Sequence, residues 1–199
     1  MKKLAYGFLA IGIVLVVLAI GLNSFSNLQY KKLINDFENN TENIAQLENI
    51  KDSQNNEKDK ITEDMIGLIK IPSIDLKYPI LEGIEDKVLK KAVGHFEVSA
   101  LPGEEGNMTL IGHNNFILSE PFKDIDRLSS GDLVTITTSD KDYTYQVIKT
   151  YTVDPYNKDI VKQGDETKLT LVTCTDDANK RFVVEALLQP NVEKDAKEE

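Results

Sequence analysis

The single cysteine of this 199-residue chain lies at the end of a predicted strand, a position where its thiol could act as a nucleophile. Cys174 ends an apolar run over residues 169–174, and Arg181 begins another over residues 181–188, beyond a short polar segment. Two such runs joined by turn-forming residues predict a β-hairpin. Residues that flank the loop lie opposite each other, so we expect Cys174 and Arg181 on one face at the end of the sheet. Taken alone, a lone cysteine is more often a small buried packing residue.

Two histidines are available to activate that thiol, and their positions differ. His113 follows Gly112 at the end of a predicted strand over residues 107–112, where its side chain could meet Cys174 at the rim. His95 also follows a glycine but enters a loop, so we expect a structural role for it. A thiol, an imidazole and a guanidinium form the minimum set for acyl transfer. The thiol attacks a carbonyl, the imidazole protonates the leaving amine and the guanidinium stabilises the oxyanion.

The elements that must position these residues are short strands. Pro79 lies inside one of them, which indicates an edge position or a bend. Helical spacing predicts short helices at residues 86–92 and 121–128. Many short strands with few helices imply a mostly β fold, a closed barrel or a sandwich, over residues 63–190. The predicted strands are residues 66–71, 76–81, 107–112, 133–138, 143–153, 169–174 and 181–188.

The N-terminus predicts a membrane anchor. Residues 4–22 carry no charge and are long enough to cross a hydrocarbon core of about 30 Å as a helix. The following residues fit a signal-peptide cleavage site poorly, which favours an uncleaved transmembrane helix. Lys2 and Lys3 keep residues 1–3 in the cytoplasm, so we expect a single-pass protein of the cell membrane whose main domain is extracellular. Residues 23–62 predict a polar, partly helical stalk, and residues 191–199 a charged tail.

Composition excludes several classes of function. The formal net charge of -10 argues against a nucleic-acid partner, because phosphate binding needs clustered lysine and arginine. One cysteine excludes an intramolecular disulfide framework and any multi-cysteine metal site. The segment 103–106 has two glycines but lacks the lysine of a phosphate-binding loop.

Several segments together resemble one family. Residues 169–174 resemble the TLxTC signature of sortases, the membrane-anchored transpeptidases of Gram-positive bacteria. The block that leads to the catalytic histidine of that family is similar to segments 94–96, 101–107 and 112–113. Leu128 with segment 131–134 is similar to a further motif, and segment 181–184 to the arginine-bearing last strand. The order His, Cys, Arg is also the family's order, and the resemblance covers about residues 65–189.

The resemblance implies a specific fold and reaction. The fold would be the closed eight-stranded sortase β-barrel with a few short helices. Cys174 would attack the Thr–Gly carbonyl of an LPXTG-type sorting signal and form a thioacyl-enzyme. His113 would act as acid and then base, and Arg181 would stabilise the oxyanion or orient the signal. An amino group of a peptidoglycan precursor or cross-bridge would resolve the intermediate and attach the surface protein to the cell wall, with no cofactor required.

Some features of the resemblance are less sharply defined. Thr173 either lines the substrate groove or is an ordinary strand-packing residue. The N-terminal anchor and the absence of a second apolar span resemble class A or class D rather than pilus-building class C. Asn114 stands where class D commonly has arginine, so the subclass is A/D-like. Some class A members bind calcium, but the acidic loop residues that could serve are expected to be solvated charges: Glu104, Glu105, Asp159, Asp165 and Glu166.

Two alternatives belong to other classes of protein. An extracytoplasmic cysteine peptidase would transfer the acyl group to water, although the cysteine-before-histidine order of papain-like enzymes is absent. A tethered β-barrel binding module would keep Cys174 as an inert packing residue. Cleavage of a sorting-signal peptide and its transfer to an added amine together separate the three.

Overall fold

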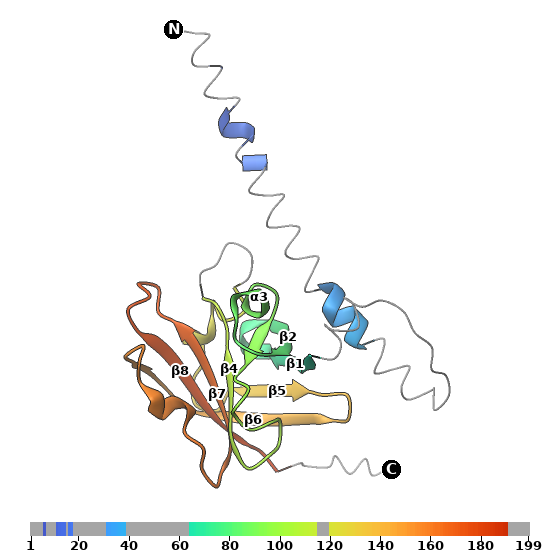
Figure 1. Ribbon diagram of the computed structural model, residues 1–199, viewed down its shortest axis with the longest axis vertical. Helices are drawn as coiled ribbons and strands as arrows, with labels where there is room; N and C mark the ends of the chain where they lie inside the picture. The colour runs from blue at the N-terminus through green and yellow to red at the C-terminus, as the bar shows by residue number, and fades with distance from the viewer. Residues whose placement is uncertain are drawn as a thin grey trace, which may run out of the picture.

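Eight strands close into a barrel in a computed structural model of the chain, which describes residues 6, 11–14, 16–17, 31–38, 64–114 and 120–190. The strand order is β1-β2-β3-β4-β7-β8-β6-β5, and β5 pairs with β1 to close it (Figure 1). The predicted mostly β, closed-barrel fold is therefore confirmed. The strands are β1 (Met65–Ile71), β2 (Leu76–Glu82), β3 (Val93–His95), β4 (Gly106–Ile111), β5 (Leu133–Thr137), β6 (Asp142–Val153), β7 (Thr167–Cys174) and β8 (Arg181–Leu188).

The helical segments are all short. The described barrel residues contain one α-helix, α3 (Asp86–Leu89), where the spacing predicted a longer one. The helix predicted at residues 121–128 is a series of turns followed by a single 3-10 turn, η2 (Ile125–Arg127). Two further 3-10 turns follow β1 and β6: η1 (Pro72–Ile74) and η3 (Lys158–Val161). Pro72 begins η1 because its fixed φ suits a first helical position and its missing N–H ends the strand.

Two strand features correct or refine the sequence analysis. Strand β3 was not predicted, because three residues centred on Gly94 carry no readable alternation. Pro79 pairs with Leu68 of β1, whereas β3 pairs only with residues 80–82 of β2. Pro79 thus lies where β2 has one ladder neighbour, which is the edge-like position in which a strand tolerates a residue without an N–H.

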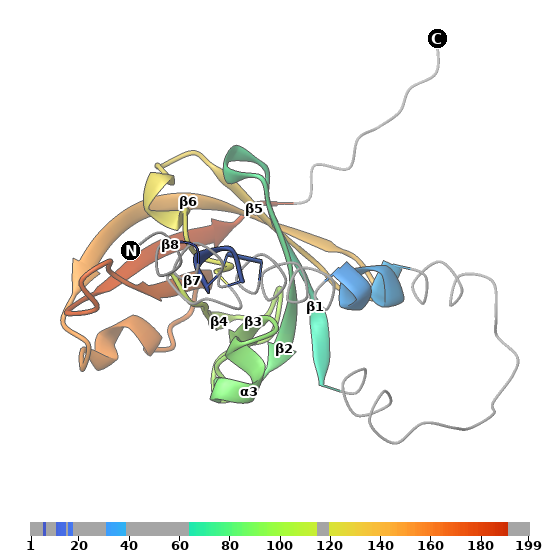
Figure 2. The same cartoon turned by 90° about the horizontal axis from the view of Figure 1, so that it is seen from above.

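The N-terminal predictions fall largely on residues outside the described set. Of the predicted span, residues 6, 11–14 and 16–17 are described and are helical. Across the described residues, no helix is both long and apolar enough to cross a membrane. Within the predicted stalk, residues 31–38 form a helix beside the barrel (Figure 2). It contacts β2 through an ion pair of 2.5 Å between Glu38 and Lys77, and Ile34 is buried. The charged tail 191–199 lies outside the described residues.

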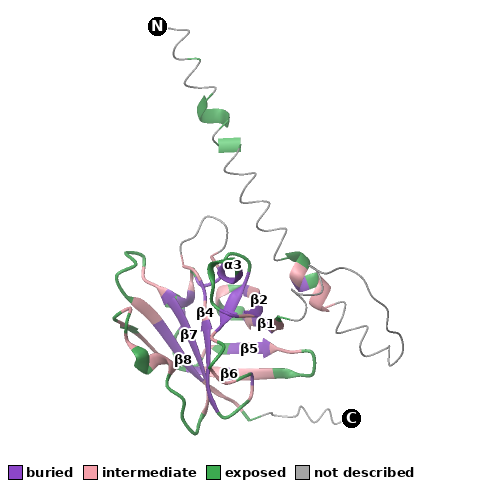
Figure 3. Ribbon diagram, in the orientation of Figure 1, coloured by how far each residue is buried: buried purple, intermediate pink, exposed green. Residues whose placement is uncertain are grey.

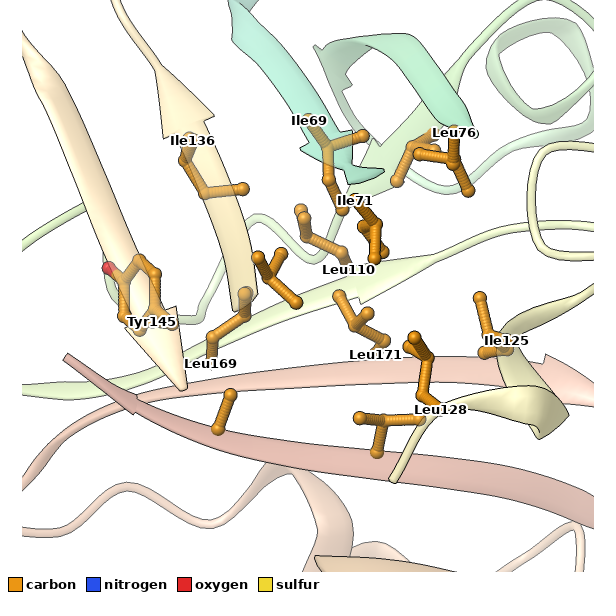
Figure 4. Close-up of a cluster of buried hydrophobic side chains, with 14 of the residues drawn as sticks. Ile69, Ile71, Leu76, Leu110, Ile125, Leu128, Ile136, Tyr145, Leu169 and Leu171 are labelled. Carbon is orange, nitrogen blue, oxygen red and sulfur yellow. The ribbon is translucent and has the colours of Figure 1, made fainter. Parts of the chain in front are cut away.

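The barrel interior is a single hydrophobic core. Strand alternation directs every second residue inward, and the purple segments of Figure 3 follow β4, β7 and β8 through the centre. The segment after residue 119 adds Phe122 to this core. Ile125 and Leu128 of the same segment pack at one side of the cluster (Figure 4). The inward residues of the three central strands are Met108, Leu110, Leu169, Leu171, Val184 and Ala186.

The outward face of β4 and β7 is also covered. Thr109 and Thr170 point away from the core yet are fully buried. The β6–β7 connection is fixed against this face by Asn107, whose Nδ2 donates to the carbonyl of Ile160 at 2.9 Å and to that of Lys162 at 3.3 Å. The two strands that lead toward His113 and Cys174 are therefore packed on both sides.

Gly103 offers a test of the β3–β4 connection. Its φ of +80° is left-handed, its N–H donates to Tyr145 Oη at 2.9 Å, and a Cβ there would lie 1.9 Å from the Tyr143 ring. Gly103→Ala should lower the free energy of unfolding by at least about 1–2 kcal/mol, from the left-handed backbone alone. Chemical denaturation measures this. The control Gly164→Ala has open space around its Cβ and should cost less than about 0.5 kcal/mol. Equal stability losses in the two variants would refute the explanation.

Candidate active site

The parallel pairing of β4 with β7 brings His113 beside Cys174. The last paired residues are Ile111 and Val172, and the N–H of Gly112 donates to the carbonyl of Val172 at 3.1 Å. Two residues further along both strands, His113 is level with Cys174. Parallel strands end at the same rim, which is why two residues so distant in sequence lie at the same end of the barrel.

The hairpin of β7 and β8 adds the arginine. The register pairs Cys174 directly with Arg181, as the flanking-residue argument predicted. His113, Cys174 and Arg181 are all half-buried, so each is held by the barrel and reachable from solvent. Together they form a rim site at the C-terminal ends of β4 and β7, with the chemistry of a nucleophile, a proton carrier and an anion-stabilising cation.

The loop between Cys174 and Arg181 is held by its own side chains. The Asp177 carboxylate accepts the hydroxyl of Thr175 and both the N–H and Nδ2 of Asn179, and these bonds lower the pKa of Asp177. Ala178 has a left-handed φ of 58°, which turns the chain back toward β8. An ordered turn fixes where Arg181 enters the strand.

Hydrogen bonds within this loop also limit which groups can meet a substrate oxyanion. The N–H of Thr175, directly after the cysteine, donates to the carbonyl of Lys180 at 3.1 Å. Arg181 uses one nitrogen, Nη1, to donate to the carbonyls of Lys180 and Ala178 at 3.1 and 3.4 Å. A guanidinium has five N–H donors, so it keeps capacity for a ligand.

The electrostatics of His113 favour the neutral ring. Partial burial lowers its pKa, because removing solvent penalises the imidazolium. Two charges at α3 act in opposite directions: Asp86 raises the pKa of His113 and Lys90 lowers it. A neutral imidazole near neutral pH can accept a proton from a thiol or an amine.

Gly112 and Phe122 support His113, and their contact could not be predicted from the sequence. The N–H of Phe122 donates to the carbonyl of His113 at 3.0 Å. A Cβ on Gly112 would lie 2.7 Å from Cδ2 of Phe122, so only glycine lets the buried ring pack against this turn. The spacing between the two residues has no helical or strand period that could have predicted the contact.

Thr173 does not lie on the face of Cys174. It is buried at 3% exposure, and its hydroxyl donates to the carbonyl of Gly112 at 2.8 Å. Alternation explains this, because adjacent residues of a strand point to opposite faces. Of the two roles expected for Thr173, groove lining and strand packing, this setting favours packing: Thr173 ties β7 to the end of β4.

His95 has a structural setting. It is 1% exposed, with Nδ1 at 3.0 Å from both carboxylate oxygens of Glu82 and Nε2 at 3.0 Å from the carbonyl of Ala100. Nε2 also contacts the hydroxyl of Ser99, which accepts the N–H of Thr109 at 3.1 Å. His95 therefore fastens the β3–β4 connection to the ends of β2 and β3.

The acidic loop residues do not converge on a metal-binding position. Within the described ranges, no group of three or more His, Cys, Asp or Glu side chains is placed to hold a metal ion. Glu104 accepts the N–H of Leu101, and Asp159 forms an ion pair of 2.6 Å with Lys162. These contacts give the residues local roles in their own loops.

Comparison with known proteins identifies the family. The sequence pattern of the sortase domain matches residues 69–189, more than half of the chain and the whole set of site residues. The chain belongs to the sortase family. The confirmed barrel and the His-Cys-Arg rim site agree with that membership.

Curated sortases resemble this chain over the barrel region. Sortase D of Bacillus subtilis is 32% identical over 124 residues, which cover 59% of this chain and 61% of the relative. Sortase A of Bacillus anthracis is 32% identical over 124 residues, which cover 61% of this chain and 59% of the relative. The matched region thus spans about three fifths of the length of these relatives. Their names include both classes, A and D, between which the sequence did not decide.

Solved sortase structures share the fold. A Clostridium perfringens Sortase D5 transpeptidase aligns with a TM-score of 0.64 at 31% identity, covering 85% of this chain and 99% of the other. Sortase C1 from Streptococcus agalactiae aligns with a TM-score of 0.61 at 34% identity, covering 64% of this chain and 69% of the other.

Removing each of the two charges at α3 should shift the pKa of His113 in opposite directions. Asp86→Asn should lower the pKa of His113 further, because it removes the negative charge that stabilises the imidazolium. Lys90→Gln should raise the pKa, because it removes a like charge. An NMR titration of the His113 ring at low ionic strength measures both shifts, since salt screens charges at this range. Lys141→Gln, at the β5–β6 turn, is the control and should leave the pKa of His113 unchanged, because Lys141 is not among the charges that shift it. Shifts of the same sign in the two α3 variants would contradict this assignment of causes.

Proposed function

We propose that this protein is a membrane-anchored cysteine transpeptidase of the sortase type. Cys174 cleaves an LPXTG-type sorting signal between Thr and Gly, forms a thioacyl-enzyme and transfers the surface protein to an amino group of a cell-wall precursor. The observation that carries the proposal is the register at the rim: Cys174 is paired with Arg181, and the β4–β7 ladder ends two residues before both His113 and Cys174. Membership of the sortase family supports it.

The first half-reaction breaks the peptide bond. The Cys174 sulfur attacks the threonine carbonyl carbon, and the carbonyl oxygen becomes an oxyanion. The tetrahedral intermediate collapses with loss of the glycine amine, which takes a proton from the His113 imidazolium. Arg181 is the donor for the oxyanion, because the N–H of Thr175 is already bonded to the carbonyl of Lys180. The products are a thioester on Cys174 and a free glycine N-terminus.

The second half-reaction forms the new peptide bond. An amine of the cell-wall precursor attacks the thioester carbonyl, and His113 takes the proton that the amine loses. Collapse of this intermediate expels the Cys174 thiolate and restores the enzyme. Water can attack the same thioester, so hydrolysis is the competing outcome.

The protonation of Cys174 and His113 is best treated as a property of the pair. A thiol beside a neutral imidazole and a thiolate beside an imidazolium contain the same number of protons. The burial that lowers the pKa of His113 favours the neutral form of its ring. When the thiol attacks, its proton passes to the imidazole of His113. The leaving amine then takes that proton from the imidazolium.

The location follows from the reaction and from the N-terminal sequence. Residues 4–22 would anchor the chain in the cell membrane, with the stalk at 23–62 carrying the barrel on the outer side. Sorting signals and cell-wall amines are both found on that side. The partners are therefore LPXTG-type surface proteins and a peptidoglycan precursor or cross-bridge amine, and the net charge of -10 disfavours nucleic acid.

Substitution of the three site residues tests the proposal. The full-length protein in detergent micelles is assayed with a fluorogenic LPXTG peptide, and an added amine reports transfer by mass spectrometry. Cys174→Ala should abolish cleavage and transfer. His113→Ala should lower kcat/KM about 10²- to 10⁴-fold through loss of proton transfer. Arg181→Ala should lower it about 10²- to 10³-fold through loss of oxyanion stabilisation.

The other arginine of the chain supplies the control. Arg127 is exposed and paired with Asp124 at 3.1 Å, so Arg127→Ala removes a guanidinium whose ion pair lies outside the His-Cys-Arg set. It should retain wild-type kcat/KM. Cleavage that persists in Cys174→Ala would rule out the proposal. Cleavage of the peptide without transfer to any amine would favour the cysteine peptidase. Binding of the peptide without cleavage would favour the binding module.

A further inference from the structure

Asn114, the residue after His113, bridges the ends of two structural elements. Its Nδ2 donates to the carbonyl oxygen of Cys174 at 3.1 Å. The same Nδ2 donates to Oδ1 of Asp176 at 2.9 Å, in the loop that follows Cys174. One side-chain amide thus joins the chain beyond β4 to the main chain of the cysteine and to the β7–β8 loop.

The bond to Cys174 occupies the place of a strand hydrogen bond. In a parallel ladder, the bond from the N–H of Gly112 to the carbonyl of Val172 would be followed by one from the N–H of residue 114 to the carbonyl of residue 174. Strand β4 has ended by then, and the carbonyl of His113 accepts the N–H of Phe122. The side-chain amide of Asn114 supplies the donor for the Cys174 carbonyl.

We propose that Asn114 is a positioning residue for the transpeptidation reaction. Its amide extends the β4–β7 pairing one step beyond the end of the strand and fixes the main chain of His113 against that of Cys174. The inference rests on the proposed function of the rim site and adds a residue outside the His-Cys-Arg set. Asn114 touches neither substrate nor reacting atoms and acts through the two residues that do.

The consequence for the reaction is geometric. Proton transfer needs the imidazole within hydrogen-bond reach of the sulfur and of the leaving amine. A displacement of about 1 Å at a reacting group can cost on the order of 10²-fold in rate. The bonds from Gly112 and Phe122 hold the chain on either side of His113, and the side chain of Asn114 bonds that turn to the Cys174 carbonyl.

The two bonds of Asn114 can be separated by exchanging chemical groups. Asn114→Ala removes both. Asn114→Asp keeps the shape but has no N–H to donate and puts a carboxylate beside Asp176. The double variant Asn114→Asp, Asp176→Asn restores a bond between the two side chains in the opposite direction. It does not restore the bond to the carbonyl of Cys174, so it isolates the contact that the proposal depends on.

The experiment compares kcat and KM of the full-length protein in detergent micelles, with the LPXTG peptide as substrate. Asn114→Ala should lower kcat about 10- to 100-fold and leave KM near the wild-type value. The exchanged double variant should stay impaired, and Asp176→Asn alone should remain near wild type. The control Gln146→Ala removes an amide that donates to the carbonyl of Gly131 near the opposite end of β8, and it should change neither constant.

A second readout needs no peptide and separates this inference from the proposed function. Iodoacetamide alkylates Cys174, the only cysteine, at a rate that depends on its arrangement with His113. Asn114→Ala should change this rate severalfold, whereas Gln146→Ala should not, even if the LPXTG peptide is not a substrate. The inference is overturned if alkylation is unchanged in Asn114→Ala, if the exchanged double variant recovers wild-type kcat, or if only KM changes.

Discussion

The parallel pairing of β4 with β7 is the constraint on which the site depends. Gly112 and Thr173 are 61 residues apart in sequence, yet the hydroxyl of Thr173 donates to the carbonyl of Gly112. Because parallel strands end at the same rim, this pairing alone carries His113 to Cys174. The β7–β8 hairpin then adds Arg181 by a local turn. A slip of one residue in β7 would turn Cys174 inward and Thr173 outward, so the closed barrel and its core protect the register of the site.

The two strands that lead to His113 and Cys174, β4 and β7, are covered on both faces. Inward residues such as Leu110 and Leu171 belong to the main core, which fixes the height of β4 against β7. Outward residues such as Thr109 are buried beneath the connections between strands, and Asn107 holds the β6–β7 connection in place. Rigid strands that end in half-buried side chains give the proposed reacting groups fixed positions and leave them accessible to solvent.

The sequence predicted the parts of this structure that are local. The hairpin register of Cys174 with Arg181 followed from two apolar runs and the turn between them. The number of short strands predicted a mostly β fold, a barrel or a sandwich, and the family resemblance implied the closed barrel. Strand β3 was missed because three residues around Gly94 carry no pattern. The packing of Phe122 against Gly112 and the bond from Asn114 to the Cys174 carbonyl were out of reach, because they join segments that only the closed barrel brings together. Strand alternation already placed Thr173 on the face opposite to Cys174. The groove-lining role was suggested only because Thr173 is next to the cysteine in the sequence.

The central claim is that the strand-end thiol of Cys174 carries the acyl group between the two amines. Acid quenching during turnover of an LPXTG peptide, followed by proteolysis and mass spectrometry, measures this directly. The account predicts that the fragment containing Cys174 gains the mass of the peptide up to its threonine, and that hydroxylamine removes the added mass as expected for a thioester. Peptide cleavage at the wild-type rate with no such adduct, or with an adduct on another residue, would contradict the account.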